Sequence, residues 1–208
     1  MYPAEDPRVI REGNLRAFFH QAIQRAARNQ RLDAGGATLH YLAHLLTDYA
    51  SSSRLFDHSA EGVHLSPLAG LYGAALQAGS PGERRLWLQR LGDLALFLSG
   101  LFSERLRRGL VDVDYYIAMG GNAYGYLCQT GGNSSRDRAL GDVFGELSRD
   151  FVAFMDLLGE VGENAAGRRA LDPARLYELW RRSGSARLAG KLRELGIEVG
   201  RGPPAWLH

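Results

Sequence analysis

Apolar residues recur three and four positions apart along almost the whole of this 208-residue chain. That spacing gathers side chains on one face of a helix, whereas a half-buried strand alternates apolar and polar residues. No clear alternating run occurs in the sequence, so the pattern predicts an all-α protein. Apolar residues make up 45% of the chain, which is enough for a sizeable core, and the length favours one domain with an appendage.

Capping residues and prolines at helix starts, and glycines at helix ends, delimit the predicted helices. They place helices at 15–30 after Asn14, 37–50, from Ser66-Pro67 onward, 80–109, 112–130 and 136–163, with a loop at 51–64. We therefore predict a helical bundle of about six helices in residues 1–165, with Phe18 in the apolar stripe of the first. In helix 80–109, apolar or small residues cover every face between Leu94 and Phe102, so this helix is expected at the centre.

Three glycines, Gly120, Gly121 and Gly125, lie inside the predicted helix 112–130, and each costs about 1 kcal/mol relative to alanine. No strand precedes them and no Lys-Ser/Thr pair follows, so the sequence has neither a dinucleotide-binding fingerprint nor a P-loop. Because Ala118, Gly121 and Gly125 are three and four positions apart, we predict a groove free of side chains. Its expected partners are small residues of the central helix, namely Gly92, Ser99 and Gly100. A local break, or a widened turn that lines a pocket, is the alternative.

His40 and His44 are the best candidates for metal binding. Their spacing places them on one helix face, and Asp48 extends the stripe by a turn. His20 could join from the first helix, and His58 or His64 from the loop. Two histidines and a carboxylate can hold zinc, iron or manganese. Neither a Glu-x-x-His nor a His-Glu-x-x-His motif is present, so solvated or hydrogen-bonded histidines without a cofactor are the favoured interpretation.

The stretch "VDVDYY" and the residues after it form a second group of candidates. Asp112 and Asp114 start a predicted helix, where carboxylates interact favourably with the helix dipole and can cap free amides. In the functional alternative they are acid/base partners in a pocket. The pocket candidates are then Asp112, Asp114, Tyr115, Tyr116, Asn122 and Tyr124.

Asp93 lies in the most apolar part of the predicted central helix. A buried carboxylate needs a partner, and we predict an arginine from another helix. Such a pair is expected to specify the packing of the helices rather than to form an active site.

Residues 166–208 form the second unit of the predicted organisation. Asp172 with Pro173, and then Ser185, are start signals for two short helices. Nine basic and four acidic residues between 166 and 201 give a net charge of +5, which leaves −3 for the rest of the chain. We predict that this arginine-rich segment packs on the acidic bundle. A helix-turn-helix that neutralises nucleic-acid phosphates is the alternative.

The whole chain carries a net charge of only +2, so charge alone points to neither nucleic acid nor a membrane. No basic start followed by an apolar stretch is present, and the longest apolar run, Leu94 to Leu98, is far below the ~20 residues that span a bilayer. We expect a soluble, cytoplasmic protein with no membrane partner. The single cysteine, Cys128, excludes an intrachain disulfide and is predicted to be a small core residue.

Two stretches resemble a family of uncharacterised bacterial all-helical proteins. One runs from "ERRLWLQRLGDLALFL" through "VDVDYYIAMGGNAYGYL", and the other is "LYELWRRSGSARLAGKLRELGI". The resemblance implies a bacterial source. It implies no activity, so it assigns no functional residues.

No catalytic motif stands out, and we therefore predict a non-enzymatic regulatory or adaptor protein that acts through helix-mediated contacts with a protein partner, as a homodimer. The second hypothesis is an enzyme or sensor with a metal or small-molecule pocket in the bundle. The third is a nucleic-acid-binding regulator that uses the basic C-terminal helices.

Overall fold

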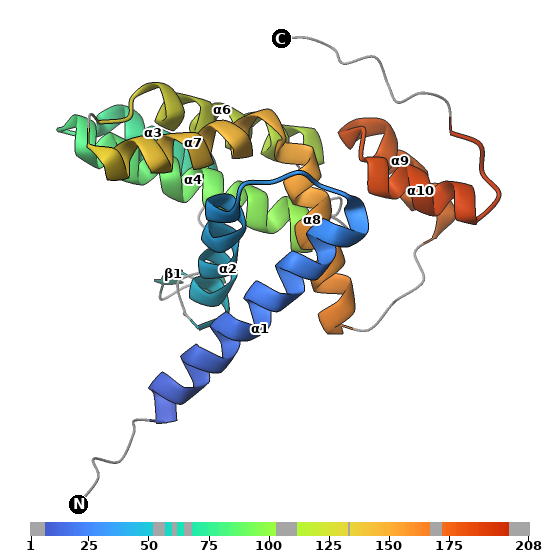
Figure 1. Ribbon diagram of the computed structural model, residues 1–208. Coiled ribbons are helices and arrows are strands. Elements are labelled where there is room, and N and C mark those ends of the chain that lie inside the picture. The colour runs from blue at the N-terminus through green and yellow to red at the C-terminus, as the bar shows by residue number, and fades with distance from the viewer. Residues whose placement is uncertain are drawn as a thin grey trace, which may run out of the picture.

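The computed structural model describes residues 7–51, 57–59, 62–64, 68–102, 112–132, 134–166 and 172–199. These residues form nine helices and one short antiparallel pair of strands, which confirms the predicted all-α class (Figure 1). The strands are β1 (Asp57–Ser59) and β2 (Gly62–His64), and they lie in the stretch predicted to be a loop. Within the described helices, none combines the length and the apolar character needed to cross a membrane.

The first three helices are α1 (Pro7–Gln30), α2 (Gly36–Ser51) and α3 (Leu68–Gln77). Helix α1 begins eight residues before the predicted start, and the predicted cap Asn14 lies inside it. It packs on α2 and α8 through buried residues such as Ala22 and Ala26. The placement of Phe18 in the core stripe was wrong, because that side chain is 50% exposed.

Helix α4 (Pro81–Leu101) packs along α3, α6 (Val113–Gln129) and α8. Ser80 starts it as predicted: its hydroxyl accepts the Glu83 N–H, and Pro81 occupies the first position. Every residue from Leu94 to Gly100 is buried, as expected for a stretch with apolar or small residues on every face. The predicted end at Gly109 lies outside the described residues.

The glycine-rich stretch is part of one continuous helix, α6, without a break. A Cβ on Gly120 would lie 2.5 Å from the Phe151 ring and 2.9 Å from the Ala95 Cβ, so this glycine permits close packing against α4 and α8. Gly121 and Gly125 were predicted to face the central helix, and this was wrong, because both face α7. There the Ser148 hydroxyl donates a hydrogen bond of 2.8 Å to the Gly121 carbonyl.

The single helix predicted at 136–163 is divided into α7 (Ser135–Arg149) and α8 (Phe151–Ala166). Asp150 separates them with a non-helical backbone, although no proline or glycine marks the position. The change of direction lets α7 lie along α6 while α8 turns away to meet α1, α4 and α10 (Figure 1). Tertiary packing therefore decides this helix boundary.

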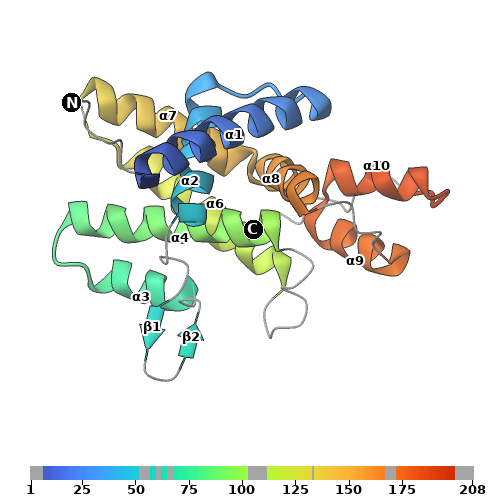
Figure 2. The same ribbon diagram turned by 90° about the horizontal axis from the view of Figure 1, so that it is seen from below.

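The C-terminal helices are α9 (Pro173–Ser183) and α10 (Ala186–Glu194). Asp172 and Ser185 cap them as predicted, with their side chains accepting the N–H groups of Ala174 and Leu188. Gly184 joins the two helices with a φ of 67°, a left-handed conformation that favours glycine. Helix α9 packs on α6 and α10 packs on α8, at one end of the molecule (Figure 2).

Candidate functional site

Asp93 lies at the junction of α2, α4 and α6 and accepts two hydrogen bonds. The Tyr41 hydroxyl donates to its Oδ1 at 2.6 Å, and the Tyr124 hydroxyl donates to the same atom at 2.8 Å. Gln89 donates in turn to the Tyr41 oxygen at 3.1 Å. The predicted arginine partner of Asp93 was wrong, because its partners are two neutral phenols.

A glycine and an aromatic residue place the Tyr124 hydroxyl in this network. A Cβ on Gly92 would lie 2.8 Å from the Tyr124 ring, so Gly92 clears the space that the ring occupies beside α4. The Tyr124 ring also stacks on Phe144 of α7, with centroids 5.7 Å apart and planes at 15°. Phe144 also meets the Tyr41 ring edge-on. The two phenols are therefore held by packing before they bond to the carboxylate.

Burial raises the pKa of Asp93 from 3.8 to about 6, while the hydrogen bonds from Tyr41 and Tyr124 act to lower it. The charged form is thus penalised by desolvation and only partly compensated by the phenols. Burial and the Asp93 charge raise the pKa of Tyr124, so this tyrosine remains a hydrogen-bond donor. Tyr124 is completely buried, and its contacts connect helices rather than line an open cleft.

Asp112 and Asp114 face α9 at the start of α6. Asp112 occupies the N-cap position but makes no capping hydrogen bond with its side chain. Its carboxylate instead pairs with Arg182 at 2.6 Å, and Asp114 lies 3.7 Å from the same guanidinium. These two acids therefore help to hold the C-terminal helices.

The six pocket candidates are not brought together around one cavity. Tyr115 and Tyr116 contact each other edge-on at 5.8 Å and are half-buried, whereas Asn122 is exposed. Tyr124 points the other way, into the network around Asp93. The α6 helix thus distributes the candidates over several faces.

The predicted histidines do lie together on the α1–α2 side. The Nε2 atoms of His40 and His44 are 3.0 Å apart, and the ring of His20 lies 6.0 Å from that of His40. His40 and Asp48 are exposed, and His44 is half-buried. Among the described residues, no group of three or more His, Cys, Asp or Glu side chains is arranged to hold a metal ion.

Asp156 of α8 is a buried carboxylate that the sequence did not lead us to expect. Its Oδ1 accepts the Ser185 hydroxyl at 2.6 Å, and its Oδ2 accepts the Arg187 N–H at 3.3 Å. Burial raises the pKa of Asp156, against the lowering effect of these donors and of the nearby cations. The signal was present in the sequence, because Asp156 interrupts the apolar run "FMDLL" as Asp93 interrupts "LGDLAL".

An ion-pair cluster continues this seam between α8 and α10. Glu163 pairs with Arg187 and, at 2.5 Å, with Lys191. Although burial raises it, the hydrogen bonds from these two cations lower the pKa of Glu163 below its ordinary value. With Arg182, three of the basic residues in the C-terminal segment thus pair with acids of the preceding helices.

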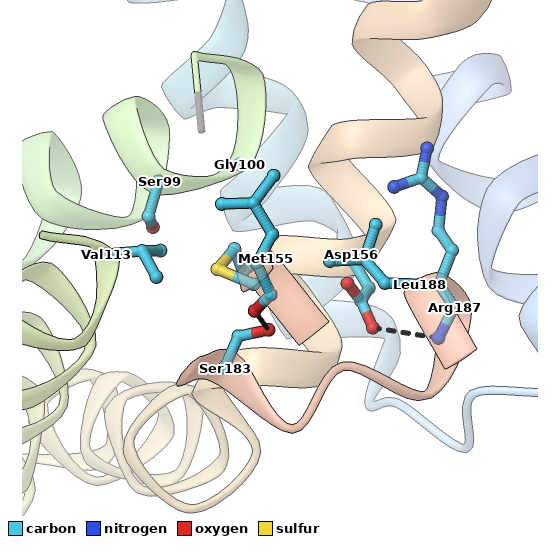
Figure 3. A pocket seen from close by; sticks show the side chains of 9 residues that line it. Ser99, Gly100, Val113, Met155, Asp156, Ser183, Arg187 and Leu188 are labelled. Atoms are coloured by element: carbon cyan, nitrogen blue, oxygen red, sulfur yellow. Dashed lines mark hydrogen bonds between the residues drawn. The ribbon is translucent and has the colours of Figure 1, made fainter. Parts of the chain in front are cut away.

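A small cavity lies beside Asp156, between α8 and the C-terminal helices. Figure 3 shows Asp156 next to the start of α10, with its hydrogen bond to Arg187 drawn. The cavity is also lined by Ser99, Val113 and Ser183, and holds about 20 Å³. That volume accommodates about one water molecule, so the cavity is too small for an organic ligand.

Helix α3 presents an apolar surface, which we call the outer face, formed by Ala69, Tyr72, Gly73 and Leu76. Tyr72 is 45% exposed and Leu76 is 61% exposed. A Cβ on Gly73 would meet nothing within 4 Å. The inner face, with Leu68, Leu71 and Ala75 buried, packs on α4. The helix is therefore apolar on both sides, and the described residues cover one of them.

Cys128 is exposed, so its predicted place in the core was wrong.

Comparison with family models, curated proteins and solved structures found no match for the chain.

Proposed function

We propose that this protein is a non-enzymatic, cytoplasmic regulatory or adaptor protein of bacterial origin that acts through helix-mediated contacts and forms a homodimer through the outer face of α3. In this proposal the helices of residues 1–165 form a bundle around α4, and residues 166–208 pack on that bundle. The observation that carries the proposal is the apolar outer face of α3.

A helix that is apolar all round is normally buried on all sides. None of the ten residues of α3 is charged, and its outer face carries the exposed side chains of Tyr72 and Leu76. Exposed apolar patches of this kind are typical of protein–protein contact sites. A second protein surface on this face would complete the burial that α4 provides on the other.

Two features favour a second copy of the same chain as the partner. Because α3 is uncharged, two copies can meet across a two-fold axis without like-charge repulsion. Because Ala69 and Gly73 are small, the facing backbones can approach closely, while Tyr72 and Leu76 supply apolar area. Helix α3 is only about 15 Å long, so flanking residues must contribute before the interface reaches the ~1,200 Å² of a stable dimer.

The ion pairs at the C-terminal seam favour this proposal over nucleic-acid binding. Arg182, Arg187 and Lys191 already have carboxylate partners, so these cations are less available for phosphates. The small cavity beside Asp156 offers no room for a substrate.

The proposal is tested by measuring molecular mass against protein concentration with light scattering or sedimentation equilibrium. We expect the wild type to associate, and Leu76→Glu to weaken the dimer at least tenfold, about 1.4 kcal/mol, because it places a charge on the outer face. Leu76 is exposed, so the variant should fold normally.

Leu86→Glu is the matched control, because Leu86 is 66% exposed on the neighbouring helix α4. Arg84 reaches the Ala75 carbonyl of α3, and Leu86 is two positions further along the helix, so it points away from α3. The proposal fails if the wild type is monomeric at every concentration reached, or if both variants associate equally well.

A further inference from the structure

His40 and His44 are four positions apart on α2, and their side chains converge. The ring centroids are 4.6 Å apart, and the two Nε2 atoms are 3.0 Å apart. In the absence of a metal, one of these nitrogens can donate a hydrogen bond to the other. The same separation also suits two ligands of one metal ion.

Metal–nitrogen bonds to imidazole are about 2.0–2.1 Å long, so two nitrogens 3.0 Å apart subtend about 95° at a shared ion. This angle is close to the 90° of a square-planar or octahedral ion. We propose that His40 and His44 chelate a single divalent late first-row transition metal ion through their Nε2 atoms, as a two-histidine site on the surface of α2.

The surroundings of the pair leave room for such an ion. His40 is exposed, so water can fill the remaining coordination positions. The charged side chains that act on His44 are those of Arg16 and Asp48. Arg16 opposes a bound cation and Asp48 favours it, so these two charges act in opposite directions.

The ligand set indicates which ions bind best. Among the described residues no third His, Cys, Asp or Glu side chain completes a site with this pair, and a two-nitrogen site with water ligands is not a closed zinc site. The affinity of nitrogen ligands for divalent first-row transition metal ions rises from Mn²⁺ to Cu²⁺ and falls again at Zn²⁺. We therefore expect Cu²⁺ to bind more tightly than Ni²⁺ or Zn²⁺.

The test is calorimetric titration of CuCl2 into the full-length protein, purified without an affinity tag, with electron paramagnetic resonance of the bound Cu²⁺. We expect one equivalent to bind with two nitrogen ligands in the spectrum. His40→Gln and His44→Gln should each weaken this binding about tenfold or more, because each removes a direct ligand. Circular dichroism checks that both variants keep their helix content.

His58→Gln, in β1, is the matched control that removes one histidine elsewhere, and its affinity should equal that of the wild type. His20→Gln should change the affinity less than twofold, because His20 is a neighbour and not a ligand. The proposal is overturned if the wild type binds no Cu²⁺, if His40→Gln and His44→Gln bind as tightly as the wild type, or if His20→Gln weakens binding as much as they do.

Discussion

Asp93 and Asp156 are both carboxylates in the apolar part of a helix, and the protein satisfies them by different means. Asp93 accepts hydrogen bonds from two tyrosines that come from α2 and α6. Asp156 accepts a serine hydroxyl and a backbone N–H at the start of α10, with Arg187 and Lys191 nearby. Burial raises the pKa of both acids.

The difference concerns what each carboxylate holds together. Neutral phenols are oriented by ring packing, so the Asp93 network depends on the aromatic contacts with Phe144. The N-terminus of a helix favours a nearby negative charge. The backbone at the start of α10 therefore stabilises the Asp156 carboxylate, without depending on ring packing. We infer that Asp93 specifies how helices of the core meet, whereas Asp156 fixes the C-terminal helices on α8.

The largest expected effect is that of Asp93→Asn, which removes the charge and keeps an acceptor for both tyrosines. Between pH 3.8 and about 6 the native state binds more protons at Asp93 than the unfolded state, so wild-type stability falls as the pH rises through this window. Relative to the wild type, the variant should therefore gain up to about 3 kcal/mol of unfolding free energy between pH 4 and pH 8. Urea denaturation of both proteins at the two pH values measures this gain. If the difference in unfolding free energy between the two proteins is the same at pH 4 and pH 8, Asp93 is not desolvated.

Asp156→Ala should have the next largest effect, at constant pH. It leaves the Ser185 hydroxyl without its acceptor and removes the hydrogen bond to the Arg187 N–H, at a cost of about 2 kcal/mol of unfolding free energy. Asp156→Asn, which keeps an acceptor for Ser185, should lose less than half as much. Urea denaturation at pH 7 provides the comparison. Equal stability of Asp156→Ala and the wild type would contradict a role of Asp156 in holding α10.

Tyr124→Phe should have the smallest effect of the three, because the ring packing remains and Tyr41 still donates to Asp93. The loss should be about 1 kcal/mol at pH 7. Because the Tyr124 hydrogen bond lowers the pKa of Asp93, its removal should raise that pKa further, which an NMR titration of the carboxyl carbon would detect. Tyr126→Phe, at an exposed position of the same helix, should change neither quantity. An unchanged Asp93 pKa in Tyr124→Phe would argue against the hydrogen bond.

Local signals in the sequence predicted three of the helix starts, whereas the start predicted at Asn14 was wrong. Ser80, Asp172 and Ser185 cap the helices that follow them, because a cap is a contact between residues two or three positions apart. The division of the predicted helix at Asp150 was missed, because it follows from how α7 and α8 pack on other helices. The exposed side chain of Phe18 was missed for the same reason.

For the candidate sites, too, the sequence predicted contacts within one helix but not contacts between helices. The spacing of His40 and His44 predicted that they share a face, since both lie on one helix. The acidic residue in an apolar run indicated that Asp93 needs a partner, but its phenol partners come from other helices and carry no local signal. The outer face of α3 was missed because an apolar helix surface in a sequence does not tell which side the rest of the chain covers.

Ser185 links two events that are separate in many proteins. Its oxygen accepts the Leu188 N–H and so starts α10, while its hydroxyl hydrogen goes to Asp156 on α8. Forming the helix and docking it thus use one side chain, and each stabilises the other. The C-terminal helix is therefore a cooperative extension of the core, and its folding is thermodynamically coupled to that of α8.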